Sequence, residues 1–129
     1  MIEFEVKSRV MPIGPKKGET VYYAAPKSQP KITAKQVEDE IVRATSLTRG
    51  DVRNALATFA EIVNSALANG ASVDLGDLGS LKVEVTSSME SSAKAVTSKS
   101  LKTPTIKFFP KQAMLDAAKS VKVKVIGEK

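Results

Sequence analysis

The 129-residue chain contains neither cysteine nor histidine. Without thiols it can form no disulfide and no thiolate metal site, and without imidazole it lacks the commonest metal ligand. Catalysis by a cysteine nucleophile or a histidine base is excluded for the same reason. The sequence therefore indicates neither a metal nor a cofactor.

Long apolar runs are also missing. No stretch approaches the roughly 18 apolar residues typical of a membrane-spanning helix. The first ten residues, MIEFEVKSRV, mix charged with apolar side chains and so do not form the apolar segment of a signal peptide. We therefore expect a soluble, cytoplasmic protein with no membrane partner.

Basic residues outnumber acidic ones, 20 to 14, which gives a net charge of +6 and a pI near 9.6. Such a chain favours polyanionic partners, although a soluble protein can also be basic without binding nucleic acid. The excess is uneven, because residues 31–70 are balanced while 86–110 carry four lysines against one glutamate. This basic, serine-rich stretch suits contact with phosphates, to which lysines and hydroxyls both bind.

The central part of the chain predicts a helix followed by a hairpin. Apolar residues recur every three or four positions from Val52 to Leu67, with Thr48 as the N-cap and Gly70 as the stop. Residues 73–85 then alternate apolar and polar around a glycine-rich turn, which is typical of two half-buried strands. This stretch supplies the apolar centre of the fold.

The N-terminal third predicts a β-hairpin and a shorter helix. Residues 2–9 and 20–24 have strand patterns separated by a loop rich in proline and glycine, and AAPKSQPK at 24–31 predicts a break. Thr33 and Gln36 have capping-box spacing before a helix that ends near residue 45. The connector to the next helix is so short that the two must form a helical hairpin or corner.

The C-terminal third begins with an excursion. Residues 86–103 show almost no periodicity and predict a mobile arm. Residues 104–109 predict a strand, Pro110 suits the first turn of a helix, and alternating valines at 121–125 predict a closing strand that completes the N-terminal sheet. The fold class is α+β. We expect a hairpin extension at 1–30 and a main domain at 31–129, with an arm at about 86–104, together forming one compact domain.

These elements occur in an order that resembles the HU/IHF family of bacterial histone-like DNA-binding proteins. Residues 47–51 (LTRGD) are similar to its L-S-x-x-D corner, and 55–70 to its A-L-x-x-F and A-L-x-x-G helix. Residues 73–75 match its V-x-L strand, 78–81 (LGSL) its F-G-T-F turn, and 108–110 its F-x-P. The hairpin at 1–30 and the final strand resemble the longer HU-like proteins of Bacteroides-type bacteria.

The resemblance implies an intertwined homodimer with a sheet saddle, protruding β-arms and a C-terminal helix. Such a protein is a non-enzymatic, nucleoid-associated architectural protein that binds double-stranded DNA with little sequence preference and shapes or condenses it. The apolar stripe of the long helix agrees, because it is broader than the short first helix can cover. The expected dimer core is Leu56, Phe59, Val63, Leu67, Leu78 and Phe108.

The expected DNA contacts are lysines of the arm and the saddle. The arm lacks the R-N-P-x-T-G tip of common family members, so an apolar residue is the candidate wedge between base steps, with packing of an arm hairpin as the alternative. The phosphate-contact candidates are Lys82, Lys94, Lys99, Lys102, Lys107 and Lys111, and the wedge candidates are Met89, Val96 and Leu101.

Two other classes of function fit the sequence less well. A structural or assembly module of HU-like fold would bind a protein partner through the added β-elements. An enzyme is disfavoured, because Glu38, Asp39 and Glu40 are consecutive and predict a solvated helix face. The glycines at 76–79 are too close together for a phosphate-binding loop. No small-molecule substrate is indicated.

Overall fold

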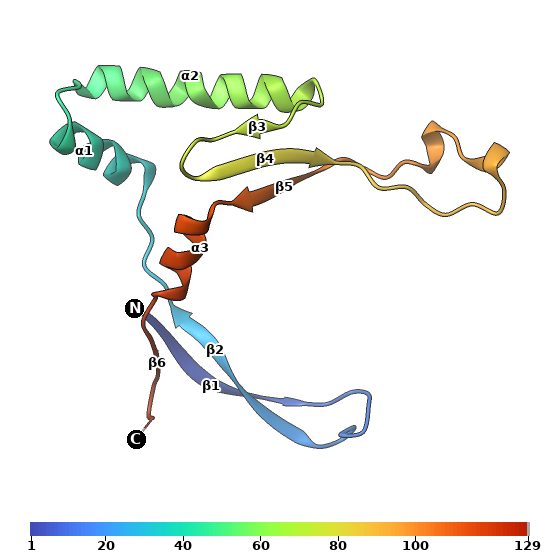
Figure 1. Ribbon diagram of the computed structural model, residues 1–129. Coiled ribbons are helices and arrows are strands. Elements are labelled where there is room, and N and C mark those ends of the chain that lie inside the picture. Colours follow the sequence, from blue (N-terminus) through green and yellow to red (C-terminus); the bar gives the residue numbers. More distant parts are fainter. Residues whose placement is uncertain (129) are drawn as a thin grey trace. The chain divides into compact units, whose positions relative to one another are not determined.

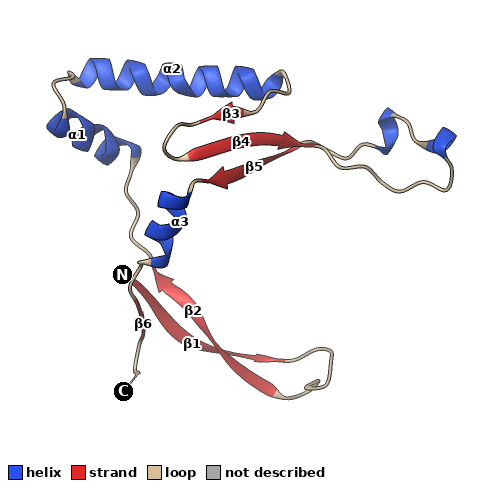
Figure 2. Ribbon diagram, viewed as in Figure 1, coloured by secondary structure: helices blue, strands red, loops and turns tan. Residues whose placement is uncertain are grey.

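A computed structural model describes residues 1–128, which form two units: Met1–Val37 with the segment from Ala117 onward, and Glu38–Asp116. The mixture of helices and sheets confirms the α+β class (Figures 1 and 2). Each helix within the described residues is too short or too polar to span a bilayer. The elements in chain order are β1 (Ile2–Val10), β2 (Thr20–Ser28), α1 (Ala34–Ala44), α2 (Arg49–Ala68), β3 (Val73–Asp74), β4 (Gly79–Glu84), the 3-10 helices η1 (Ala93–Ala95) and η2 (Ser98–Ser100), β5 (Thr105–Pro110), α3 (Gln112–Lys119) and β6 (Val123–Val125).

The first unit is a three-stranded sheet in the order β2-β1-β6 (Figure 2). β1 runs antiparallel to β2, with Val6 opposite Ala24, and parallel to β6, with Phe4 beside Val125. The prediction that the C-terminal strand completes the N-terminal hairpin is confirmed. Because β1 alternates, Phe4 and Val6 share one face of the sheet while Glu3 and Glu5 share the other.

The predicted break at residues 24–31 is wrong for its first half, because β2 continues through Pro26 to Ser28. Pro26 lies opposite Phe4, next to a register irregularity between Glu3 and Phe4. β2 is also an edge strand, so only one side of its backbone must pair. Proline is tolerated at such a place because its missing N–H costs no ladder hydrogen bond.

In the second unit, α2 runs along a sheet of order β3-β4-β5 (Figure 1). Its N-terminus is a capping box: the Asp51 backbone N donates to Thr48 Oγ1 at 3.1 Å, and the Thr48 backbone N donates to Asp51 Oδ2 at 3.2 Å. Its C-terminus is Asn69, followed by Gly70 with φ +79°. Both predicted ends of the helix are confirmed.

The prediction for Pro110 is wrong, since this residue closes β5 and α3 begins at Gln112. Pro110 lies opposite Gly79, where the first strand residue of β4 has no side chain. A Cβ added to Gly79 would stand 2.2 Å from the Phe109 carbonyl oxygen, and φ there is +147°. Glycine is therefore required for the close approach that begins the β4–β5 pairing.

Glu38 is not on a solvated face, as the acidic run had suggested, but is 7% exposed. Its Oε1 accepts from Arg49 Nη1 at 3.0 Å and from Arg53 Nη2 at 2.9 Å. Asp39 Oδ1 accepts from the same Arg49 nitrogen at 2.6 Å. The tight corner between α1 and α2 brings both arginines against Glu38, a tertiary effect that acidic periodicity does not reveal.

We expect the Glu38 cluster to contribute to acid stability. Hydrogen bonds from Arg53, then Arg49, outweigh desolvation and lower the pKa of the Glu38 carboxyl. A lowered folded pKa stabilises the protein above the unfolded value of about 4.3, and this contribution is lost as pH falls through the folded pKa. Glu38→Gln should therefore lower the melting temperature at neutral pH and reduce its fall on acidification, as measured by circular dichroism.

The matched control is Glu40→Gln. Glu40 is an exposed neighbour that pairs with Arg43 one turn away in α1, so its loss should change the melting curve little. Equal effects of the two substitutions would contradict a special role for Glu38.

Candidate nucleic-acid interface

Two predicted contact residues meet on the sheet of the second unit. Lys82 of β4 and Lys107 of β5 are directly opposite each other in the antiparallel register. Lys107 Nζ lies 3.8 Å from Glu84 Oε1 and 5.5 Å from the centre of the Phe109 ring, and it remains about half exposed. Like charges placed opposite each other destabilise a sheet. The Lys82–Lys107 pair therefore does not stabilise the fold, but it can bind an external anion.

The two faces of this sheet differ in character. Alternation puts Leu81 opposite Phe108 and Val83 opposite Ile106 on one face, and Lys82 opposite Lys107 on the other. Lys111 follows β5, where its backbone N donates to the Leu78 carbonyl at 3.0 Å, at the end of the strand pair away from the arm. The register thus joins Lys82 and Lys107 but not Lys111.

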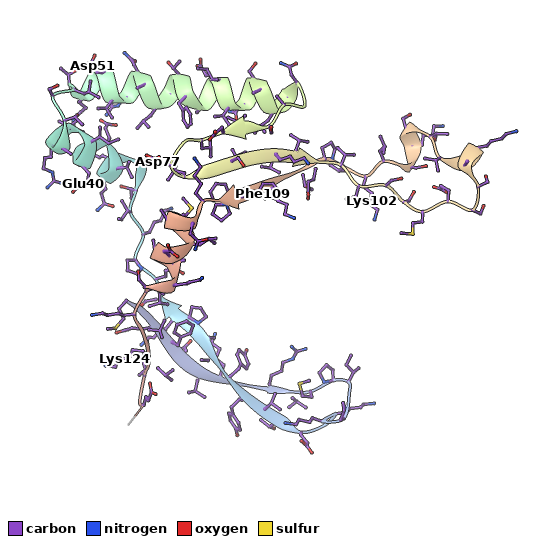
Figure 3. All side chains as sticks on the ribbon, viewed as in Figure 1. Glu40, Asp51, Asp77, Lys102, Phe109 and Lys124 are labelled. Atoms are coloured by element: carbon purple, nitrogen blue, oxygen red, sulfur yellow. The ribbon has the colours of Figure 1, made fainter. Side chains whose placement is uncertain are left out.

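The arm leaves the sheet after Glu84 and returns at Thr105 (Figure 1). Lys94 lies in η1, Lys99 lies in η2, and Lys102 follows on the returning segment; all three are exposed. Figure 3 shows side chains projecting from both sides of the arm, with Lys102 on the part that leads back to β5. The arm therefore displays its lysines to solvent.

The arm has more local structure than its composition suggested. Ser87 and Leu101 form a β-bridge, and the Lys102 backbone N donates to the Thr86 carbonyl at 2.8 Å. Farther along, Ser100 is 6% exposed, and its Oγ donates to Glu90 Oε1 at 3.2 Å. The sequence predicted a stretch without structure because hydroxyl side chains carry no hydrophobic period.

A hydrogen-bonded clasp holds the two sides of the arm together. Ser88 Oγ donates to Glu90 Oε1 at 2.9 Å, and the Ser88 backbone N donates to the Ser100 carbonyl at 2.8 Å. Thr97 caps η2, with its backbone N donating to Ser100 Oγ at 3.2 Å. Sequence reasoning missed Glu90 and Ser100, although the spacing from Thr97 to Ser100 is that of a capping box.

The three wedge candidates are exposed on the arm. Met89 is fully exposed, and Val96 and Leu101 are each 53% exposed. Insertion at a base step and packing of an arm hairpin both stay predictions for these three residues.

The residues expected in a dimer core are mostly uncovered in one chain. Val63 is 8% exposed, but Phe59 is 46% and Leu78 is 52% exposed. Next to them, an apolar groove of ≈ 570 Å³ lies between the end of α2 and the strands β4 and β5, lined in part by Leu67, Val83 and Ile106. The second unit thus presents a broad apolar surface.

A long capped helix over a three-stranded antiparallel sheet, with a basic arm extending from two of the strands, defines the HU-like class of DNA-binding folds. The chain belongs to this family: residues 1–124 match the HU-HIG family, described as an HU domain fused to a winged helix-turn-helix, immunoglobulin or glycine-rich motif.

Solved structures show the same fold. A protein of Bacteroides vulgatus ATCC 8482, described as a proposed bacterial DNA-binding protein, superposes over 99% of this chain with a TM-score of 0.62 and 16% identity. This chain covers 49% of that protein, or about half its length. An HU variant from Thermotoga maritima matches 67% of this chain and 99% of its own length, with a TM-score of 0.50 and 21% identity. No curated protein sequence matches the chain.

The clasp predicts a measurable change in arm order. Ser100→Ala removes the hydroxyl that bonds Glu90 and the Thr97 backbone, so the arm should open more often. Limited digestion with trypsin should then cut after Lys94 and Lys99 faster than in the parent chain. The control Ser91→Ala changes an exposed serine of the same arm and should leave the rate unchanged. Equal rates for both variants would show that the clasp does not order the arm.

Proposed function

We propose that this protein is a histone-like architectural protein that binds double-stranded DNA with little sequence preference. The observation that carries the proposal is the exposed arm with Lys94, Lys99 and Lys102, continuous with strands that place Lys82 opposite Lys107. Lysines of this kind neutralise phosphates and release counterions, which supplies affinity without reading bases. Lys111 would contact the duplex at the far end of the saddle. Shaping or condensing DNA in the nucleoid, within the cytoplasm, is the corresponding role.

The proposed active form is a homodimer. Among the described residues, only Val52 and Val63 are buried hydrophobic side chains, too few for a stable core of this size. Leu56 and Phe59 of α2 and Phe108 of β5 are each 40–46% exposed, so a second copy can cover them together. The proposed seam consists of Leu56, Phe59, Val63, Leu67, Leu78 and Phe108.

The proposed function involves no reaction. The exposed cations of the arm are Lys94, Lys99 and Lys102, and Glu38 and Asp39 of α1 are engaged by arginines. Phosphate contacts and an apolar wedge from Met89, Val96 or Leu101 require neither a cofactor nor a small-molecule substrate. Binding energy, rather than chemistry, would change the shape of the duplex.

The arm lysines should control the salt dependence of DNA binding. Lys94→Gln, Lys99→Gln and Lys102→Gln together should reduce the slope of log affinity against log salt by about 0.9 for each phosphate that the variant no longer neutralises. Fluorescence anisotropy with a mixed-sequence duplex over a salt series measures this slope. The triple variant Lys31→Gln, Lys35→Gln and Lys119→Gln removes the same charge outside the arm and should retain the parental slope.

An absence of binding at low salt would overturn the proposed function. If the protein then captured a protein partner instead, the assembly-module alternative would be favoured. Parental slopes in the arm variant, with binding intact, would move the interface away from the arm.

The proposed dimer seam predicts that a charge placed in it will lower the mass of the protein in solution. Phe59→Glu places a charge in the apolar surface of α2, where the partner would have to desolvate it, and should shift the protein toward monomer. Sedimentation equilibrium measures the mass, and circular dichroism checks that helices remain. Glu61→Gln, on the polar side of α2, should leave the mass unchanged. A parent chain that is monomeric at high concentration would contradict the proposed dimer.

A further inference from the structure

The tip of the N-terminal hairpin is a built turn. Residues 11–19 join β1 to β2, and the Met11 backbone N donates to the Glu19 carbonyl at 3.0 Å while the Gly18 N donates back to the Met11 carbonyl at 2.9 Å. Two successive turns follow inside this closure, helped by Gly14 and Gly18 with φ of +90° and +85°. The backbone thus holds the side chains of the tip in a defined arrangement.

The tip displays an apolar residue between two prolines. Ile13 is 75% exposed and is preceded by Pro12, with Pro15 two residues later. The prolines fix their own φ and limit the conformations of the tip, so Ile13 would lose little freedom on insertion into a partner. Isoleucine and proline are among the side chains that proteins insert between base steps.

The tip of this hairpin carries more basic than acidic residues. Arg9, Lys16 and Lys17 are exposed near the tip, and none of them forms an ion pair with another described residue. Glu19 is the acidic residue of the tip, so residues 9–19 carry three basic side chains against one carboxylate. This excess of positive charge would attract a polyanion to the tip.

The tip carries residue types that the arm at 86–104 lacks. That arm contains no proline before Pro104 and no arginine, whereas the hairpin tip contains both next to its lysines. We propose that residues 9–18 form a second DNA-contacting element, in which Arg9, Lys16 and Lys17 contact phosphates and Ile13 inserts at a base step. This inference rests on the proposed DNA-binding function and extends it to the added β-sheet.

The phosphate contacts are tested by a salt series. Lys16→Gln with Lys17→Gln in the full chain should reduce the slope of log affinity against log salt by about 0.9 for each phosphate left without its lysine. The control pair Lys27→Gln and Lys122→Gln removes the same charge at the base of the same sheet and should keep the parental slope. A parental slope in the tip variant overturns the inference and leaves the tip free for a protein partner.

The arm variant distinguishes this failure from failure of the proposed function. A reduced slope in the arm variant, together with a parental slope in the tip variant, would remove the inference and retain DNA binding. A reduced slope in the tip variant supports the inference whatever the arm variant shows. If the parent chain does not bind the duplex, both the function and the inference fall.

The wedge is tested by the shape of the bound duplex. Ile13→Ala should lower energy transfer between dyes at the two ends of a saturated duplex, because the kink disappears while the phosphate contacts remain. Ile32→Ala, which shortens an isoleucine that is 72% exposed outside the tip, is the matched control. Parental energy transfer in Ile13→Ala would overturn the wedge role.

Discussion

The unfilled apolar surface of α2 is the constraint on which the second unit depends. The helix carries apolar residues over a wide stripe, yet only Val52 and Val63 are buried, and Phe59 remains 46% exposed. The sheet beneath it presents Leu81 and Phe108 in register on one face. Burial of apolar area is the main stabilising term in folding, so the rest of this core is best supplied by the proposed second copy.

The β4–β5 register connects this core to the proposed function. One face of each strand must be apolar to meet α2, and the period of two then sends Lys82 and Lys107 to the opposite face. The same pairing fixes where the arm leaves and returns. Gly79 begins the ladder because the Phe109 backbone leaves no room for a Cβ. The register of β4 against β5 therefore determines both which side chains face α2 and which lysines lie on the opposite face.

Much of this arrangement was predictable from local patterns. The capping box of Thr48 and Asp51, the stop at Gly70 and the alternating strands were predicted because each depends on residues close together in sequence. The candidate site was predicted in outline, since charge and composition located the arm. Errors arose where a distant segment decided the outcome: Pro26 is accommodated by an edge position, Pro110 by Gly79, and Glu38 by two arginines of α2.

Periodicity, caps and composition were enough to predict most of the elements, their order, the basic character of residues 86–110 and the resemblance to HU-like proteins. The fold determines that Lys82 lies opposite Lys107, that Ser100 and Glu90 close the arm, and that Met11 pairs with Glu19 at the hairpin tip. Those features depend on register and on contacts between segments, which local sequence patterns do not encode.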